Sequence, residues 1–340
     1  MNDPCNKLKY FEEVEKVPRE VYYHYTSLEA LFSIVQSHTF RLMSLKSSND
    51  RTELYYKPED FLADVSRLCE SEEDENTKRY YSLLRDSLVQ NQKLIWKELK
   101  TPKKPYALCL SAKKDNLTHW DRYANQCRGV AIGFNVKSLD VLYERTKSIG
   151  FGPGLFDIGR ALYSQENIDH WIKTVMNRGY DLMRELNKRT PEQSLRQTIE
   201  KDGFLFMSSL CKNVMHFVKT HAFCDEDEYR LYFDANNIAD TLHLIDLMKN
   251  NSDDEFYRLV RSCFLRLVTT LDIRDENFVV TQKGIRGFHN LCLDEIWGSG
   301  VIPEIVLGPL CAQNKSELQR FLKQNGLEGT KVTVSSVPIR

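Results

Sequence analysis

Apolar and polar residues alternate along this chain in patterns that predict both strands and helices. Residues 21–26 are rich in β-branched and aromatic side chains, which favours a strand. Apolar positions at helical spacing follow, so we expect a helix within residues 28–38. Short apolar runs bounded by polar residues or glycine predict further strands at residues 40–44, 106–111 and 129–134.

Two long stretches have helical periodicity. Residues 58–100 carry apolar stripes, interrupted by an acidic run at 70–75 that we interpret as an exposed turn. Residues 136–218 are mainly helical in pattern, which predicts an insertion or cap inside one α+β domain spanning residues 18–338.

Strand-like alternation returns at residues 223–233. Beyond it the pattern predicts a helix, a strand, a second helix and a closing strand, at residues 254–271, 304–307, 315–324 and 331–335.

Charge and cysteine usage narrow the class of protein. Among 340 residues, 47 basic and 48 acidic side chains leave a formal charge of -1, which excludes a global footprint for non-specific nucleic-acid binding. The 9 cysteines are scattered without a CxxC pair, as is typical of reduced thiols in the cytoplasm. No segment approaches the roughly 18 apolar residues of a membrane span, and the first residues do not resemble a signal peptide. We therefore expect a soluble cytoplasmic protein that has no contact with the membrane.

An acidic segment offers the strongest chemical signal. If residues 224–233 form a strand, Glu226, Glu228 and Arg230 share one face, while the apolar residues between them face the core. Two carboxylates and a guanidinium would then line a polar cleft. The alternative is an edge strand whose charged outer face prevents aggregation.

A histidine and a hydroxyl form a second candidate group near the start of the chain. His24 and Thr26 flank Tyr25 and lie on one face of the predicted strand, where they could donate or accept directed hydrogen bonds. The alternative is a histidine satisfied by a neighbouring carbonyl group.

Aromatic and turn-forming residues supply two further candidates. Trp120 and Tyr123 fall on the same side of a short helical turn and could stack on a planar ring, or could simply belong to the core. Asn49 and Asp50 could contact a ligand or cap a helix.

Several chemistries have no support in the sequence. The glycine-rich GxGxxG and GxxxxGK[ST] loops, the HExxH and GxSxG motifs and a Cys/His quartet with zinc spacing are all absent. The 8 histidines are dispersed, so we predict no metal site.

In order and spacing, six motifs resemble the bacterial family called domain of unknown function 2971. They are Y-H-Y-T-S-L at 23–28, S-S-N-D-R-T-E at 47–53, C-L-S-A-K-K-D-N-L-T-H-W-D-R-Y-A at 109–124, R-G-V-A-I-G-F at 128–134, F-C-D-E-D-E-Y-R-L at 223–231 and V-L-G-P at 306–309. That family is more remotely similar to the ADP-ribosyltransferase superfamily. The resemblance implies a split, mainly antiparallel sheet with flanking helices and a cleft that binds NAD.

The resemblance also implies roles for the candidate residues. His24, with Thr26 and the intervening Tyr25, matches a first-strand motif that contacts the ribose beside the nicotinamide. Glu228, followed by Tyr229 and Arg230, matches the catalytic glutamate, and Glu226 would position the acceptor. Tyr123 or Trp120 would provide the aromatic wall. Asn49 and Asp50 would approach the nucleotide, although Arg51 replaces the proline that usually follows them.

The implied activity is cleavage of the bond between nicotinamide and ribose, with NAD as substrate. A carboxylate would stabilise the oxocarbenium-like transition state, and ADP-ribose would pass to a protein, a nucleic acid or water. A role in stress response or phage defence would fit this family. Two alternatives stay open: a non-catalytic module that senses nucleotides or mediates interactions, and a metal-dependent nuclease. In a nuclease Asp50, Glu226 and Glu228 would bind the cation, and Arg230 stands where a lysine is expected.

Overall fold

A computed structural model describes most of the chain: residues 20–47, 55–91, 105–138, 156–187, 214–235, 275–281 and 284–339, with single positions at 207, 210, 211, 272 and 273. The chain divides into two compact units. The helical unit comprises Met1–Lys16, Ser48–Lys104 and Ala161–Phe223, and the sheet unit comprises Val17–Ser47, Pro105–Arg160 and Cys224–Arg340.

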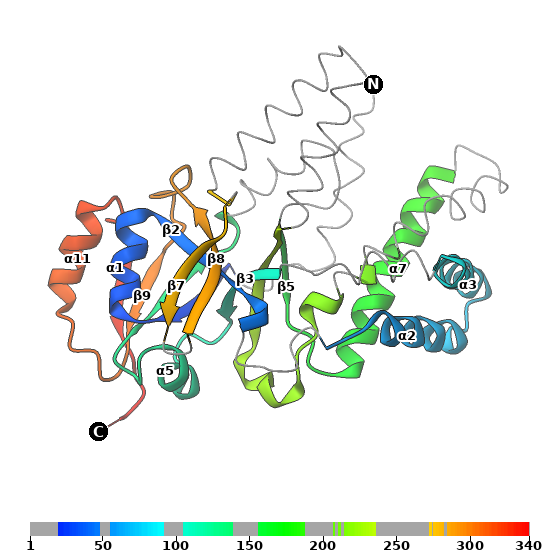
Figure 1. Ribbon diagram of the computed structural model, residues 1–340, viewed down its shortest axis with the longest axis horizontal. Coiled ribbons are helices and arrows are strands. Elements are labelled where there is room, and N and C mark those ends of the chain that lie inside the picture. Colours follow the sequence, from blue (N-terminus) through cyan, green and yellow to red (C-terminus); the bar gives the residue numbers. More distant parts are fainter. Residues whose placement is uncertain are drawn as a thin grey trace, which may run out of the picture. The chain divides into compact units, whose positions relative to one another are not determined.

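The described strands of the sheet unit form one ten-stranded sheet (Figure 1). Its main path runs β10-β9-β4-β1-β3-β2-β8-β7, and β6 pairs with both β3 and β5. Pairing is antiparallel except between β9 and β10. The strands are β1 Val21–Thr26, β2 Thr39–Ser44, β3 Pro105–Ser111, β4 Val130–Asn135, β5 Phe156–Arg160, β6 Glu228–Asp234, β7 Asn277–Thr281, β8 Gly284–Cys292, β9 Glu304–Leu307 and β10 Lys331–Val334.

The sheet forks at β3. One edge of β3 is paired with β6 along its whole length. The other edge is shared, because β1 joins it where Tyr23 lies opposite Ser111 and β2 joins it where Met43 lies opposite Ala107. Two branches therefore leave the same edge of β3: β1-β4-β9-β10 and β2-β8-β7. The predicted α+β class with a mainly antiparallel sheet is confirmed.

Each face of this sheet has its own apolar cluster. On one face, Tyr22, Leu108 and Leu231 belong to the large core, together with residues of α1 (Leu28–Ser37) and α11 (Lys315–Gln324). On the other face, Tyr23 and Tyr25 pack with α5 (Leu117–Tyr123) in a smaller cluster. Because adjacent residues of a strand point to opposite faces, β1 contributes to both clusters.

Local chemistry explains the element ends. The Ser27 side chain accepts a hydrogen bond from the Ala30 amide at 3.2 Å and so caps α1. Glycine is required just before β4, because a Cβ at Gly129 would lie 2.2 Å from the Thr26 carbonyl oxygen. A Cβ at Gly308 would similarly lie 2.5 Å from the Cys127 carbonyl oxygen. Two of the family-like motifs thus contain glycines that the packing demands.

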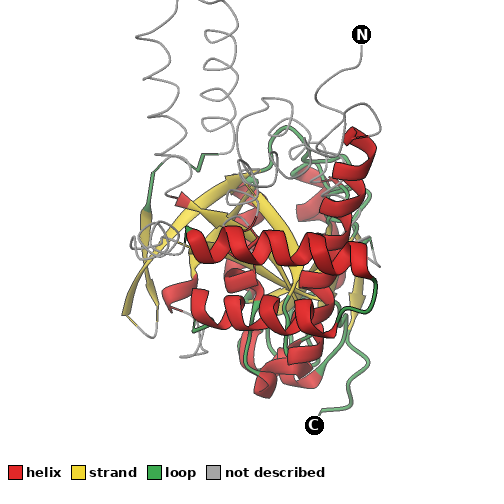
Figure 2. Cartoon of the chain, turned by 90° about the vertical axis from the view of Figure 1, so that its right-hand side faces the viewer, coloured by secondary structure: helices red, strands yellow, loops and turns green. Residues whose placement is uncertain are grey.

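The described part of the helical unit consists mainly of three helices: α2 (Pro58–Ser71), α3 (Glu75–Gln90) and α7 (Gln165–Asn187), drawn red in Figure 2. Each helix contributes fully buried apolar residues, among them Phe61, Leu84 and Met176. Tyr81 on α3 donates a hydrogen bond to Asn177 on α7 at 2.5 Å. An ion pair between Arg67 and Asp169 joins α2 to α7. The predicted turn between α2 and α3 is confirmed, although it is shorter than the acidic run.

Several predicted boundaries change. Residues 156–160, inside the predicted helical insertion, form β5 of the sheet, while α7 belongs to the helical unit. The strand expected at 223–233 starts only at Glu228, because residues His221–Glu226 form a 3-10 helix, η3. Strands β7 and β8 were not predicted. The helix expected at 254–271 lies outside the described residues.

Candidate functional site

The most distinctive polar group of the sheet unit surrounds Glu226, and we call it the Glu226 centre: Glu226, Tyr123, Arg122 and His119. Tyr123 donates its phenolic hydrogen bond to Glu226 Oε1 at 2.5 Å. Nη1 of Arg122 lies 3.9 Å from the same oxygen. The Glu226 carboxylate is buried, whereas 51% of the Arg122 side chain is exposed. The centre therefore combines a shielded carboxylate with a cation that solvent reaches.

Backbone contacts fix Glu226 in place. Its carbonyl oxygen accepts hydrogen bonds from Ser111 Oγ at 2.7 Å and from His119 Nε2 at 3.1 Å. Burial lowers the pKa of His119, although the hydrogen bond to this carbonyl opposes that effect. A neutral imidazole that carries its proton on Nε2 can make this bond, because a carbonyl only accepts. The segment before β6 is thereby tied to β3 and α5.

A turn in the backbone separates Glu226 from the strand. Asp227 has a φ of 42°, in the left-handed region, and its carboxylate accepts a hydrogen bond from Arg160 at 2.7 Å. Glu226 is the last residue of η3, and Glu228 is the first residue of β6. The prediction that Glu226 lies on one strand face with Glu228 and Arg230 is therefore wrong.

Glu228 and Arg230 do share a face, but that face is buried. Arg230 Nε donates to Glu228 Oε1 at 3.0 Å, and Nη2 lies 3.4 Å from Oε2. All seven residues of β6 are buried, and the strand lies between β3 and β5. The prediction of an open polar face is wrong because the residues of β6 are buried, and the prediction of an edge strand is wrong because β6 pairs with a strand on each edge.

His24 occupies the fork of the sheet. Its Nδ1 lies 3.1 Å from the carbonyl oxygen of Cys109 on β3, and its ring meets Phe40 edge-on at 5.9 Å. Burial lowers the pKa of His24, while the hydrogen bond to Cys109 acts in the opposite direction. The neutral ring therefore holds its proton on Nδ1 and donates it to a β3 carbonyl. This is the alternative that the sequence left open for His24.

The sheet register places His24 and Glu228 on opposite faces. Tyr23 lies opposite Ser111, which in turn lies opposite Glu228, so these three side chains share one face. His24, the neighbour of Tyr23, points to the other face with Thr26. The strands β1 and β6 are about 10 Å apart, with β3 between them. The structure thus brings the two segments together but does not direct His24 and Glu228 toward each other.

The remaining predicted residues divide between core and undescribed segments. Trp120 is fully buried, donates its indole hydrogen bond to Asp115 at 2.6 Å, and meets Tyr25 edge-on at 4.8 Å. Tyr25 donates its hydroxyl hydrogen bond to the Lys113 carbonyl at 2.6 Å. Both rings therefore belong to the smaller core cluster. Thr26 is half-buried at the end of β1. Asn49 and Asp50 lie outside the described residues.

Sequence reasoning did not select Arg122, His119 or Ser111. A signal for His119 was present, because the Asn116 side chain accepts from the His119 amide at 3.2 Å and starts α5 there. With that start, His119 and Tyr123 are four residues apart on one side of the helix. Ser111 contacts the Glu226 carbonyl oxygen only because β3 pairs with β6, which no local pattern in the sequence reveals.

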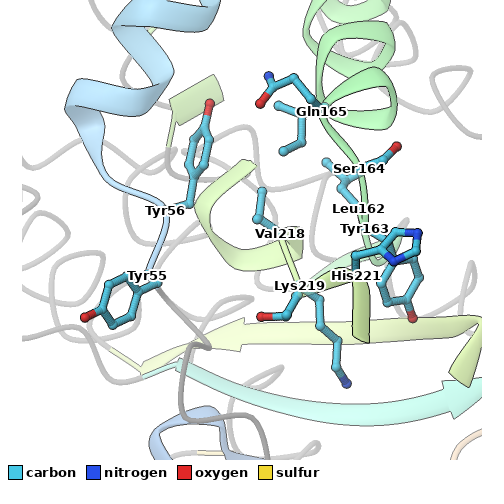
Figure 3. A pocket seen from close by; sticks show the side chains of 11 residues that line it. Tyr55, Tyr56, Leu162, Tyr163, Ser164, Gln165, Val218, Lys219 and His221 are labelled. Carbon is cyan, nitrogen blue, oxygen red and sulfur yellow. The ribbon is translucent and has the colours of Figure 1, made fainter. Parts of the chain in front are cut away.

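The helical unit contains a separate cavity of about 240 Å³, at the start of α7 (Figure 3). Several of its polar side chains already have partners. Tyr56 donates to Asp64 at 2.5 Å, and Gln165 donates to Asp64 at 2.8 Å and to Asp169 at 2.9 Å. We regard it as a packing depression rather than a binding site. It is lined by Tyr55, Tyr56, Leu162, Tyr163, Ser164, Gln165, Ile168, Val218, Lys219, Thr220 and His221.

Two further features are absent from the described residues. Within these ranges, no three or more His, Cys, Asp or Glu side chains are grouped so that they could hold a metal ion. In the same part of the chain, no helix combines the length and apolar character needed to cross a membrane.

The fold and the site define an α+β protein with a forked, mainly antiparallel sheet and a carboxylate centre at its third strand. Residues 119–231 match the model of a family described as Protein of unknown function (DUF2971). The match confirms the resemblance over this stretch, which begins at His119 and contains every member of the Glu226 centre. No curated protein and no solved structure matches the chain.

Proposed function

We propose that the sheet unit is an NAD-consuming enzyme of the ADP-ribosyltransferase type, with the Glu226 centre as its reacting end. The observation that carries this proposal is the contact of one carboxylate with a phenol at 2.5 Å and a guanidinium at 3.9 Å. The carboxylate suits a ribose hydroxyl, the phenol ring suits a planar ring, and the guanidinium suits a phosphate.

Each side chain has a role in this chemistry. The Glu226 carboxylate stabilises the positive charge that develops on the ribose carbon as the bond to nicotinamide breaks. Tyr123 holds that carboxylate by a charge-assisted hydrogen bond and presents its ring beside it. Arg122, which is half exposed, pairs with the diphosphate of NAD.

Two further observations support the proposal. The sheet is mainly antiparallel, as the resemblance to this superfamily implies, and two of its branches leave the same edge of β3. The match to the family model spans residues 119–231, the stretch that supplies all four residues of the centre. The transferred ADP-ribose would pass to a protein, a nucleic acid or water.

The proposal moves the catalytic role from Glu228 to Glu226. Glu228 is buried and forms an ion pair with Arg230 within β6, so we assign its carboxylate a structural role. His24 donates to a β3 carbonyl and holds the fork together. Both residues then act as positioning residues for the strand ends that carry the centre.

The test is incubation of the full chain with NAD labelled in its adenylate half, together with a cell lysate. Released nicotinamide is measured, and the label on protein and on nucleic acid is separated. We expect Glu226→Gln to lower nicotinamide release by about 100-fold or more. The control is Asp225→Asn, an exposed acid one residue away, which should release nicotinamide at the wild-type rate. Absence of release by the wild-type chain would overturn the proposal, and equal release by Glu226→Gln would remove Glu226 from it.

A second candidate is a nucleotide-binding module without turnover. The burial of the Glu228 and Arg230 pair favours it, because this pair supplies no carboxylate to a ligand. Titration calorimetry separates the two candidates. Binding of NAD that is weakened by Arg122→Ala, with no nicotinamide released, would establish the binding module.

A further inference from the structure

The hairpin of β7 and β8 exposes three large apolar side chains on one face. Phe278 is 67% exposed, Val280 79% and Ile285 75%. Val280 lies directly opposite Ile285, and Phe278 lies opposite Gly287, so the three side chains form one contiguous patch across two strands. Contiguous apolar surface of this kind marks an interaction site more often than isolated exposed residues do.

β7 is also the outermost strand at its end of the described sheet. Proteins usually protect such edges with charged residues, proline or bulges. β7 reads Asn-Phe-Val-Val-Thr and has none of these. The strand at the opposite end of the sheet path, β10, is shorter and begins with the charged Lys331. The two ends of the sheet therefore differ in how they are protected.

We propose that β7 is an interface with a second copy of this chain, formed by antiparallel pairing centred on Val279. In this register Phe278 lies opposite Val280 of the copy, and Asn277 lies opposite Thr281 of the copy. Residues two apart in a strand direct their backbone N–H and C=O groups to the same edge. Phe278 and Val280 can therefore both hydrogen-bond to the second copy. The apolar and polar positions of the strand match themselves under this two-fold rotation.

Pairing in this register extends the patch across four strands. Ile285 and Val280 of one copy continue into Phe278 of the other, and the two-fold axis generates an identical second row. A Cβ at Gly287, which lies opposite Phe278, would be 2.3 Å from Glu276 Oε1, so the apolar row ends at Phe278. The apolar positions of β7 in the second copy therefore match those of β7 in the first. An edge of five residues is small beside the roughly 1,200–2,000 Å² of a stable interface, so we expect a reversible dimer.

The test is sedimentation velocity of the full chain over a hundredfold range of concentration. We expect the wild type to shift from monomer to dimer as concentration rises, and Val280→Lys to stay monomeric. The matched control is Val334→Lys on β10, which is 61% exposed and should dimerise like the wild type. Circular dichroism of each variant verifies that the fold is kept.

Hydrogen exchange gives a second readout. The amides of Phe278 and Val280 should become more protected as dimer forms in the wild type, and not in Val280→Lys. A wild type that stays monomeric at every concentration overturns the proposal and leaves a strand of another protein as the occupant. A dimer that survives Val280→Lys also overturns it, because the contact would then lie elsewhere.

Discussion

His24 lies on β1 and Glu228 on β6, which pair with opposite edges of β3, yet their side chains leave opposite faces of the sheet. The imidazole enters the large core side and donates to the Cys109 carbonyl, while the carboxylate pairs with Arg230 on the other side. The polar residues of this protein are therefore organised as separate centres. Their individual roles can be tested by different kinds of measurement.

The ion pair of Glu228 and Arg230 should act on stability. Glu228→Gln removes the charge of the carboxylate that lies 3.0 Å from the buried Arg230 guanidinium, so we expect a loss of about 3–5 kcal/mol in the free energy of unfolding. Urea denaturation measures this loss. Replacing both residues, as Glu228→Leu with Arg230→Met, should recover much of it, because apolar side chains then replace both members of the ion pair. A stable Glu228→Gln variant that had lost all nicotinamide release would return the catalytic role to Glu228.

Gly129 should tolerate no side chain. In Gly129→Ala the new Cβ would meet the Thr26 carbonyl oxygen at 2.2 Å, and both contacting groups are backbone. We expect a loss of about 1–3 kcal/mol or more, since the strand ends must move apart. Gly329→Ala is the matched control, because nothing lies within 4 Å of its Cβ. Thermal unfolding of both variants would decide, and equal melting temperatures would contradict the close approach.

His24 should make stability depend on pH. Burial lowers its pKa from 6.5 in the folded chain, so the unfolded chain binds the proton first as the pH falls. The stability linked to His24 is complete above pH 6.5 and is lost as the pH falls through the lower folded pKa. Burial lowers the pKa of His119 as well and adds a loss in the same direction.

Urea unfolding at pH 7.5 and 5.5 measures this effect. The difference between the two pH values should shrink in His24→Gln, whose amide can still donate to the Cys109 carbonyl. His170→Gln, an exposed change on α7, serves as the control and should leave the difference unaltered. An unchanged difference in His24→Gln would show that other groups titrate.

Tyr123 should matter through its hydroxyl group. Tyr123→Phe keeps the ring but removes the donor to the Glu226 carboxylate, so we expect a loss of about 1.5–3 kcal/mol in stability. Under the proposed function, nicotinamide release should fall as well, because the carboxylate loses its fixed orientation. Wild-type stability and release in this variant would show that the 2.5 Å contact has no energetic weight.

Local patterns predicted those elements whose residues carry a clear period. The strand at 21–26, the helix capped by Ser27, and the strand at 304–307 followed by a helix at 315–324 all agree with the structure. β8 escaped prediction because it contains two glycines and polar residues that break the alternation. β5 was hidden in a stretch whose pattern is mainly helical.

The arrangement of the candidate residues could not be predicted in the same way. Whether His24 and Glu228 share a face depends on their registers with β3, which involve residues far apart in sequence. The position of Glu226 depends on the left-handed backbone of Asp227, in a run of acidic residues without glycine. A register shift of one residue moves every side chain of a strand to the other face, so the residue types alone do not decide which side chains lie together.

The branch that runs from β1 to β10 also has a consequence for synthesis on the ribosome. β1 and β4 are made early, but β9, which pairs with β4, and β10, which pairs with β9, are translated long afterwards. Until they emerge, β4 presents an uncovered edge that contains Val130 and Ile132. A nascent or truncated chain that stops before residue 304 should therefore aggregate or recruit chaperones, even though its first strands are already complete.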